Sequence, residues 1–170
     1  MSKFVTSTSV EFKKFFRSKI PLITLLAFTL VPFIGGFFMF VLKNPDFAER
    51  LGFISKKAQI MGTADWPSYL SLLTQAISIG GLIIFGFIIS WIFGREYSDR
   101  IIKDLLALPI SRNIIVLSKF IVAIIWCLIL SIFVLVLGLV VGNMVNIPGW
   151  SQEIIVRGLM IYSVCAVLTY

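Results

Sequence analysis

The stretch IPLITLLAFTLVPFIGGFFMFVL, residues 20–42, decides the fold class. It holds 23 residues without a single charged side chain. A helix of that length exceeds the roughly 20 residues needed to cross a hydrocarbon layer about 30 Å thick. The stretch is also too long for the apolar core of a cleaved signal peptide. Residues 20–42 are therefore expected to form a membrane-spanning helix, with a kink at Pro32 because proline removes one backbone donor.

The rest of the chain is similarly apolar. Hydrophobic residues make up 59% and charged residues 14% of the 170 positions, whereas soluble domains have about 45–50% and about 25%. Three further apolar stretches, 70–93, 116–142 and 154–170, are each expected to cross the membrane. We thus expect an all-α integral membrane protein, with residues 1–170 forming one transmembrane domain of about four spans. Because the last stretch has no polar flank, we expect the domain to be truncated at the C terminus.

The distribution of Lys and Arg predicts the orientation. These residues number 15 against 8 Asp and Glu, a net charge of +7, and they collect in the cytoplasmic loops of membrane proteins. The tail before residue 20 holds five and the segment 94–115 holds four, whereas the loop 43–69 holds four and the loop 143–153 none. The N terminus is therefore expected in the cytoplasm, in a multi-pass protein of the cell membrane. Lys119, near the start of the third span, is expected to extend towards the interface, and no nucleic-acid partner is expected.

The tail has the pattern of an amphipathic helix. Phe12, Phe15 and Phe16 recur at helical spacing, with basic residues between them. Such a helix over residues 1–19 would lie flat in the cytoplasmic interface; the alternative is a positively charged flank without defined structure. Aromatic residues near the ends of the spans are expected to be interface anchors rather than ligands: Trp66, Tyr69, Trp91 and Trp150.

A charged segment, GREYSDRIIKDLLALPISR at residues 94–112, separates the second and third spans. As a helix it places its apolar residues largely on one side and its charged residues on another. Glu96 lies four residues before Arg100. Asp99 has the same spacing to Lys103, and each such pair adds about 0.2–0.5 kcal/mol. The helix could lie on lipid or dock on a soluble partner; a solvated loop that only fixes topology explains the pattern equally well.

Missing residue types exclude several kinds of chemistry. The chain has no histidine, which removes HExxH metalloproteases, Ser-His hydrolases and His-ligated haem. Cys127 and Cys165 stand alone in apolar runs and predict neither a disulfide framework nor a zinc site. The chain is therefore expected to hold no cofactor, no metal and no catalytic residue. Because there is also no Walker-type phosphate loop, any ATP chemistry must come from a partner.

Few polar residues lie inside the predicted spans. Thr74, Gln75 and Ser78 fall in the outer half of the second span and could line a translocation path, although contacts between helices are the interpretation that the pattern favours. Gly138 and Gly142 form a GxxxG step, which would permit helix packing or dimerisation. The near absence of ionisable groups in the spans argues against transport driven by protons or sodium.

The charged segment resembles a known loop. FGREYSDR (93–100) followed by KDLLALPISRNIIVLSKF (103–120) is similar to the loop after the second span in permease subunits of type-2 ABC exporters, which include bacitracin and lantibiotic efflux permeases. The likeness extends to the basic tail and to the outer loop ending in ADWPSYLSLLTQ (64–75). In that family the loop is a coupling helix that docks on the ATPase subunit. The resemblance implies an ATPase contact at Glu96, Asp99, Arg100, Lys103, Asp104, Leu105, Pro109 and Arg112.

The resemblance also implies a function. The chain would be a permease subunit that pairs with a second copy or a paralogue and expels an amphipathic compound such as an antibiotic peptide. ATP and Mg²⁺ would bind to the partner ATPase. Ile101 stands where family members often have threonine, and the spans visible here are half to two-thirds of the usual six.

Two rival functions follow from the same features. A membrane anchor or sensor would recruit a soluble cytoplasmic partner through residues 94–112 without transporting anything. An intramembrane enzyme is disfavoured, because acid–base catalysis needs titratable groups within reach of one another.

Overall fold

The computed structural model describes residues 3–44, 64–98 and 111–170, and within these ranges every regular element is helical. The elements are α1 (Lys3–Phe16), α2 (Ile20–Lys43), α5 (Trp66–Ala76), the π-helical η1 (Ile77–Gly81), α6 (Leu82–Ser98), α8 (Arg112–Met144) and α9 (Gln152–Thr169). This confirms the predicted all-α class. In the described part of the chain, four helical stretches are long and apolar enough to cross a membrane: 20–43, 66–95, 112–144 and 152–169.

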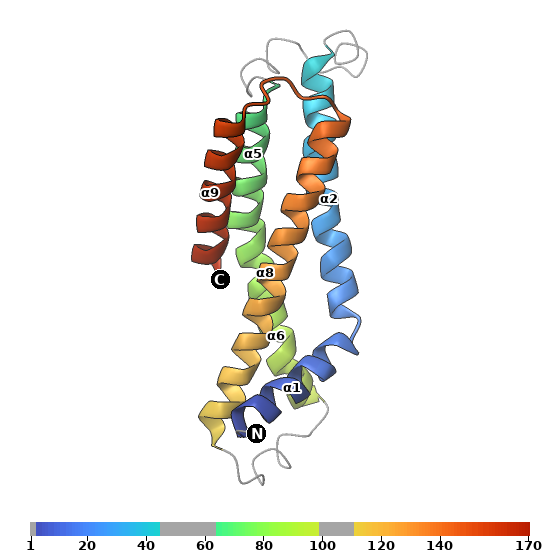
Figure 1. Cartoon of the computed structure of the whole chain (residues 1–170). Helices are drawn as coiled ribbons and strands as arrows, with labels where there is room; N and C mark the ends of the chain where they lie inside the picture. The colour runs from blue at the N-terminus through green and yellow to red at the C-terminus, as the bar shows by residue number, and fades with distance from the viewer. Residues whose placement is uncertain (1–2, 45–63, 99–110) are drawn as a thin grey trace.

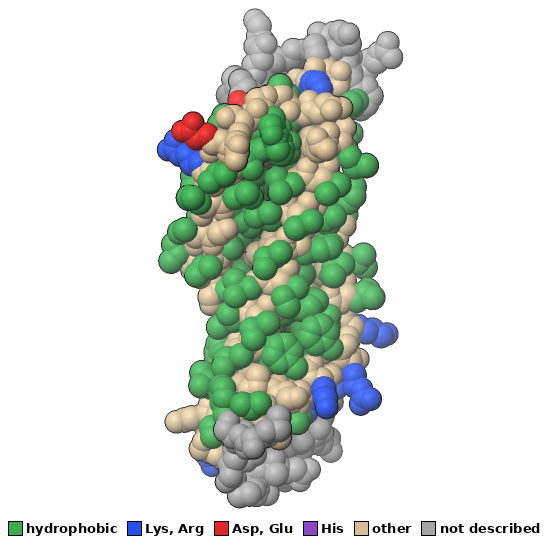
Figure 2. All heavy atoms as spheres, viewed as in Figure 1, with side chains coloured by type: hydrophobic (Ala, Val, Ile, Leu, Met, Phe, Trp, Pro, Cys, Tyr) green, Lys and Arg blue, Asp and Glu red, His purple; other side chains and the backbone are tan. Residues whose placement is uncertain are grey.

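The helices form an elongated bundle (Figure 1). α8 packs against α1, α2 and α6, while α9 lies along α5 and η1. α1 lies across one end of the bundle, where α6 ends and α8 begins; we refer to this as the α1 end. The turn between α8 and α9 lies at the opposite end. The apolar side chains cover the length of the bundle in Figure 2, and Lys and Arg side chains gather near the α1 end.

The second span is a single long helix that changes its winding. It begins at Trp66, four residues before the predicted start, because Asp65 caps it: the Asp65 carboxylate accepts a hydrogen bond of 2.9 Å from the Ser68 N–H. At Ile77–Gly81 the helix becomes a π-helix for five residues and then continues as α6. π-helical turns are rare and often mark functional positions. This one begins two residues after Gln75 and contains Ser78.

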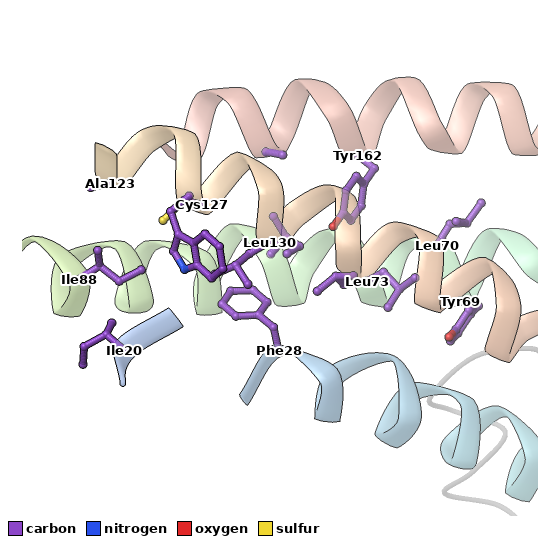
Figure 3. Close-up of a cluster of buried hydrophobic side chains, with 14 of the residues drawn as sticks. Ile20, Phe28, Tyr69, Leu70, Leu73, Ile88, Ala123, Cys127, Leu130 and Tyr162 are labelled. Atoms are coloured by element: carbon purple, nitrogen blue, oxygen red, sulfur yellow. The ribbon is translucent and has the colours of Figure 1, made fainter. Parts of the chain in front are cut away.

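The core lies where α8 faces its neighbours (Figure 3). Phe28 of α2, Leu73 of α5 and Leu130 of α8 are all buried there. Polar groups in the same region are paired: the Trp126 indole N–H donates to the Thr24 hydroxyl at 3.1 Å, joining α8 to α2. Tyr162 donates to the Ser131 carbonyl at 2.8 Å, joining α9 to α8. Bonds of this kind matter inside a membrane, where water cannot replace them.

Pro32 does not interrupt α2, which is continuous from Ile20 to Lys43. The proline is buried, and the Tyr69 hydroxyl of α5 donates to its carbonyl at 3.2 Å. About one turn after Pro32, Gly35 lies close to Tyr69 of α5 and Gly36 lies close to Val141 of α8, so α2 packs tightly against both helices.

The interface-anchor interpretation is wrong for two of the four aromatic residues. Trp66 is 1% exposed and Tyr69 is fully buried. Trp66 instead packs edge-on against Tyr69 and Trp150, with ring centroids 6.1 and 4.9 Å away. Trp150 is 63% exposed, as an anchor would be. The two buried rings fill the space beside Gly142 of α8, so they act as core residues of the bundle.

Candidate functional site

At the α1 end, ion pairs join a carboxylate of α1 to lysines of α1 and α8. Lys119 of α8 lies about two turns inside the helix that begins at Arg112, and its ammonium group contacts the Glu11 carboxylate of α1 at 2.9 Å. The Lys119 side chain is 2% exposed and the Glu11 side chain 10%. Lys14, on the same helix as Glu11, contacts the other carboxylate oxygen at 3.0 Å. The Lys119 charge is therefore held inside the protein, against α1, and is not solvated; its extension to the membrane interface stays a prediction.

Two opposing effects act on the Glu11 carboxyl. Burial favours its neutral form, whereas the hydrogen bonds and positive charges of Lys119 and Lys14 favour the carboxylate. The lysines outweigh the burial, so the pKa of Glu11 lies below its usual value. Glu11 is thus charged at neutral pH. The pair links helices that are more than one hundred residues apart in the sequence.

Aromatic side chains form another part of the contact of α1 with α8 and α6. Phe15 is 2% exposed and packs edge-on against Trp126 of α8 and Trp91 of α6, at 5.6 and 6.3 Å between ring centroids. Phe16 adds a second contact with Trp126 at 5.3 Å. The predicted helix is present, but much of its aromatic face packs on protein rather than on lipid, since α8 and α6 supply complementary rings.

α1 also contacts α6 through a hydrogen bond. The Arg95 guanidinium, near the end of α6, donates to the Lys14 carbonyl of α1 at 3.2 Å and lies 5.4 Å from the centre of the Trp91 ring. α1 therefore touches both helices that border the charged segment, α6 before it and α8 after it.

Most of the predicted ATPase contact lies outside the described residues. Asp99, Arg100, Lys103, Asp104, Leu105 and Pro109 fall in the range 99–110, and of Glu96 only the helical backbone is described. Arg112 is exposed as the first residue of α8. Ser111 occupies the cap position, although its side chain makes no capping hydrogen bond. The described residues thus show which helices adjoin residues 99–110: α6 ends before them, α8 begins after them, and α1 lies across both helix ends.

Grooves run along α5 in the other half of the bundle. One, of about 370 Å³, lies between α5 and α9 and includes Thr74 and Gln75 of the predicted translocation path. A second, of about 430 Å³, lies between α2 and α5 and also includes Gln75. The first groove is mostly apolar, with Arg157 of α9 among its lining residues. An apolar surface with a few polar groups and one cation suits an amphipathic molecule.

The three polar residues of the predicted path differ in their surroundings. The Thr74 hydroxyl donates to the Leu70 carbonyl at 2.8 Å, and the Ser78 hydroxyl to the Thr74 carbonyl at 2.9 Å. Both hydroxyls are thus satisfied within their own helix. Gln75 is exposed, and its amide donates only a long hydrogen bond of 3.3 Å to the Ser71 hydroxyl among the described residues. Gln75 therefore has the most capacity to bind a molecule in either groove.

The two glycines of the GxxxG step face α5. A side chain at Gly138 would begin 2.5 Å from Leu73, and one at Gly142 would begin 2.6 Å from the Trp66 ring. The close approach that GxxxG permits is thus used inside this chain, between α8 and α5. In the described ranges, no three His, Cys, Asp or Glu residues come together in a way that could hold a metal ion.

Comparison with known proteins identifies the family of this chain. A family model described as an ABC-2 family transporter protein matches residues 8–170. The chain belongs to the ABC-2 transporter family. The match begins within α1 and includes all four candidate spans, so the ABC-2 chain is a multi-pass membrane protein. This confirms the resemblance to type-2 ABC permeases.

One curated relative adds detail. The bacitracin transport permease protein BCRB of Bacillus licheniformis is 32% identical to the ABC-2 chain over 78 residues. The aligned part covers 46% of this chain and 38% of the relative, so the chain spans well under half of that protein in the alignment. No solved structure matches the chain.

Proposed function

We propose that this ABC-2 chain is the permease part of an ATP-driven exporter in the cell membrane, with its N terminus in the cytoplasm. The family match carries the proposal, because it extends from α1 through the charged segment to α9. The α1 end, rich in Lys and Arg, would face the cytoplasm as the positive-inside rule expects. Residues 94–112 would then project towards a soluble ATPase subunit.

The ATPase would supply the chemistry, and the permease the path. ATP and Mg²⁺ would bind to the partner, and its closure would displace residues 94–112 together with the ends of α6 and α8. A second copy of the permease, or a paralogue, would form the other side of the path. ATP binding would thereby shift the bundle between two arrangements with different affinity for the substrate. No covalent step would take place on the permease itself.

The substrate would be an amphipathic compound such as a peptide antibiotic. Support comes from the groove between α5 and α9, where apolar residues lie beside Gln75 and Arg157. Bacitracin, after which the relative is named, is the first compound to test.

Recovery of an ATPase tests the coupling role of residues 94–112. The tagged full-length gene product is purified from mild-detergent membranes beside a Glu96→Lys, Asp104→Lys variant, and bound proteins are identified by mass spectrometry. We expect an ABC ATPase with the parent protein and its loss from the variant, because reversing two charges on a docking surface replaces attraction by repulsion. Recovery of the ATPase with both proteins would contradict docking at these residues. A well-folded parent that recovers no ATPase would instead favour an anchor or sensor.

Gln75 provides a separate test of the path. Replacing Gln75 with leucine is expected to lower bacitracin efflux by about two- to tenfold, because one lost hydrogen bond is worth about 0.5–1.5 kcal/mol. ATPase recovery should stay unchanged, since Gln75 lies in the other half of the bundle. Efflux is followed as the lowest bacitracin concentration that inhibits growth.

The control for Gln75 is Ser163→Leu on α9. Ser163 is also a polar residue within a span, but it is exposed, donates only to its own helix and lines neither groove. Equal losses in the two variants would show that polarity in general, and not the groove, supports efflux.

A further inference from the structure

The contact between α1 and α8 combines many apolar groups with one buried ion pair. Phe15 and Phe16 pack against Trp126, and such apolar contacts are non-directional. Phe15 and Phe16 could pack on other apolar side chains of α8 in a shifted register, because buried Val122 and Leu130 lie about one turn to either side of Trp126. The ion pair differs, because Glu11 is the only acidic residue of α1 and Lys119 the only lysine of α8, so their 2.9 Å contact joins one point on each helix.

The ion pair and the apolar contacts also differ in what they contribute to the free energy of the α1–α8 contact. A buried ion pair is about as stabilising as apolar residues of similar size, because desolvation of the charges offsets their attraction. Its best-attested role is to fix register, since sliding the helices would leave a buried charge without its partner. Here Lys119 is almost fully enclosed, with the Phe93 ring 5.9 Å from its ammonium group. Any shift of α1 along α8 would remove the Glu11 carboxylate from that enclosed position.

We infer that the Glu11–Lys119 pair is a positioning pair that fixes the register of α1 on α8. Lys14 has a lesser part, because its side chain is 41% exposed and water can solvate its charge. Since α1 also holds Arg95 of α6 through the Lys14 carbonyl, this register determines how α1 lies against both helix ends that border residues 99–110. The inference about register does not depend on the proposed function. Its consequence for ATPase docking does.

Disulfide formation can measure the register directly. The hydroxyl oxygens of Thr8 and Ser118 lie 3.3 Å apart, so cysteines at these positions should form a disulfide in the native register. A second pair, Phe4→Cys with Ser118→Cys, reports a shift of one helical turn, about 6 Å. Both pairs are placed in the full-length gene product with its native cysteines replaced, and oxidation is carried out in intact membranes.

The decisive background is Glu11→Leu with Lys119→Met, which replaces the ion pair by apolar residues of similar size. We expect the protein to remain folded, the 8–118 disulfide to fall severalfold and the 4–118 disulfide to appear. Lys14→Met is the matched control, since it removes the exposed partner of Glu11 and keeps Lys119; it should leave the 8–118 disulfide unchanged. An unchanged pattern in the apolar background, or an equal change in Lys14→Met, overturns the assignment.

ATPase recovery from the same membranes tests the consequence for docking. The apolar background should recover less ATPase than Lys14→Met does. A shifted register with undiminished recovery would refute the link between register and docking. Absence of ATPase from the parent protein would refute the proposed function, while the disulfide result would still decide the register.

Discussion

Replacing Trp66 with alanine is expected to lower the free energy of unfolding by about 3–5 kcal/mol, the range seen for buried tryptophan truncations. The ring is 1% exposed and fills the space between Tyr69, Trp150 and the backbone at Gly142. Its removal would leave a cavity where α5, α8 and the α8–α9 turn meet. The backbone hydrogen bond from the Trp66 N–H to the Pro148 carbonyl, 3.3 Å long, does not involve the ring and should remain in the variant.

Trp150→Ala is the matched control for this prediction. The Trp150 ring contacts the Trp66 ring, but Trp150 is 63% exposed. Its truncation should therefore lower the free energy of unfolding only by the loss of the ring contact, about 0.5–1.5 kcal/mol. The measurement is thermal unfolding of the detergent-purified proteins, followed by the fraction that remains monodisperse after heating. Equal losses for the two variants would show that Trp66 is an interface anchor after all.

Gly142→Leu is expected to have the second large effect. A side chain there would begin 2.6 Å from the Trp66 ring and 3.2 Å from the Tyr69 ring. Neither ring can yield easily, because both are buried and each packs against the other. Overpacking of this kind costs about 1–3 kcal/mol and sometimes more, and here it would force α8 away from α5. The same heating assay should show a lower midpoint and a smaller folded yield.

The control for Gly142 is Gly86→Leu on α6. A Cβ atom placed at Gly86, which is exposed, would have no atom within 4 Å apart from its chain neighbours and the backbone of its own helix. Leucine also favours a helix more than glycine does, by up to about 1 kcal/mol. Gly86→Leu should therefore leave stability unchanged or raise it. A large loss at Gly86 together with none at Gly142 would contradict the packing of α8 on α5 described above.

Local sequence determines the helices well but not their neighbours. The stretch 20–42 has one possible reading because 23 uncharged residues in a row suit a membrane helix and little else. The positions of Trp66 and Tyr69 are harder to predict from the sequence. The sequence pattern of aromatic residues next to an outer loop is the same whether the rings face lipid headgroups or a second helix. Gly142 is the sequence feature that indicates burial of these rings, since it leaves the space that they occupy.

The Glu11–Lys119 pair shows what a single sequence cannot supply. The pattern at each position has an ordinary local interpretation, as an acid in a basic tail and as a lysine near the end of a span. What could have suggested the pair is that Glu11 is the only acidic residue before residue 45 and Lys119 the only charge between residues 113 and 152. Even so, many arrangements would place them apart, and only the packing of α1 on α8 brings them together.

The π-helical segment rotates the two halves of the second span relative to each other about the helix axis. An α-helix advances about 100° per residue, whereas a π-turn accommodates one residue more than an α-turn, so Ile77–Gly81 offsets the angular phase of everything after it by about one residue. A helical wheel drawn through residues 66–98 with a single period would assign α6 side chains to the wrong faces. Two wheels, one ending at Ala76 and one starting at Leu82, are needed to see which residues of this span share a side.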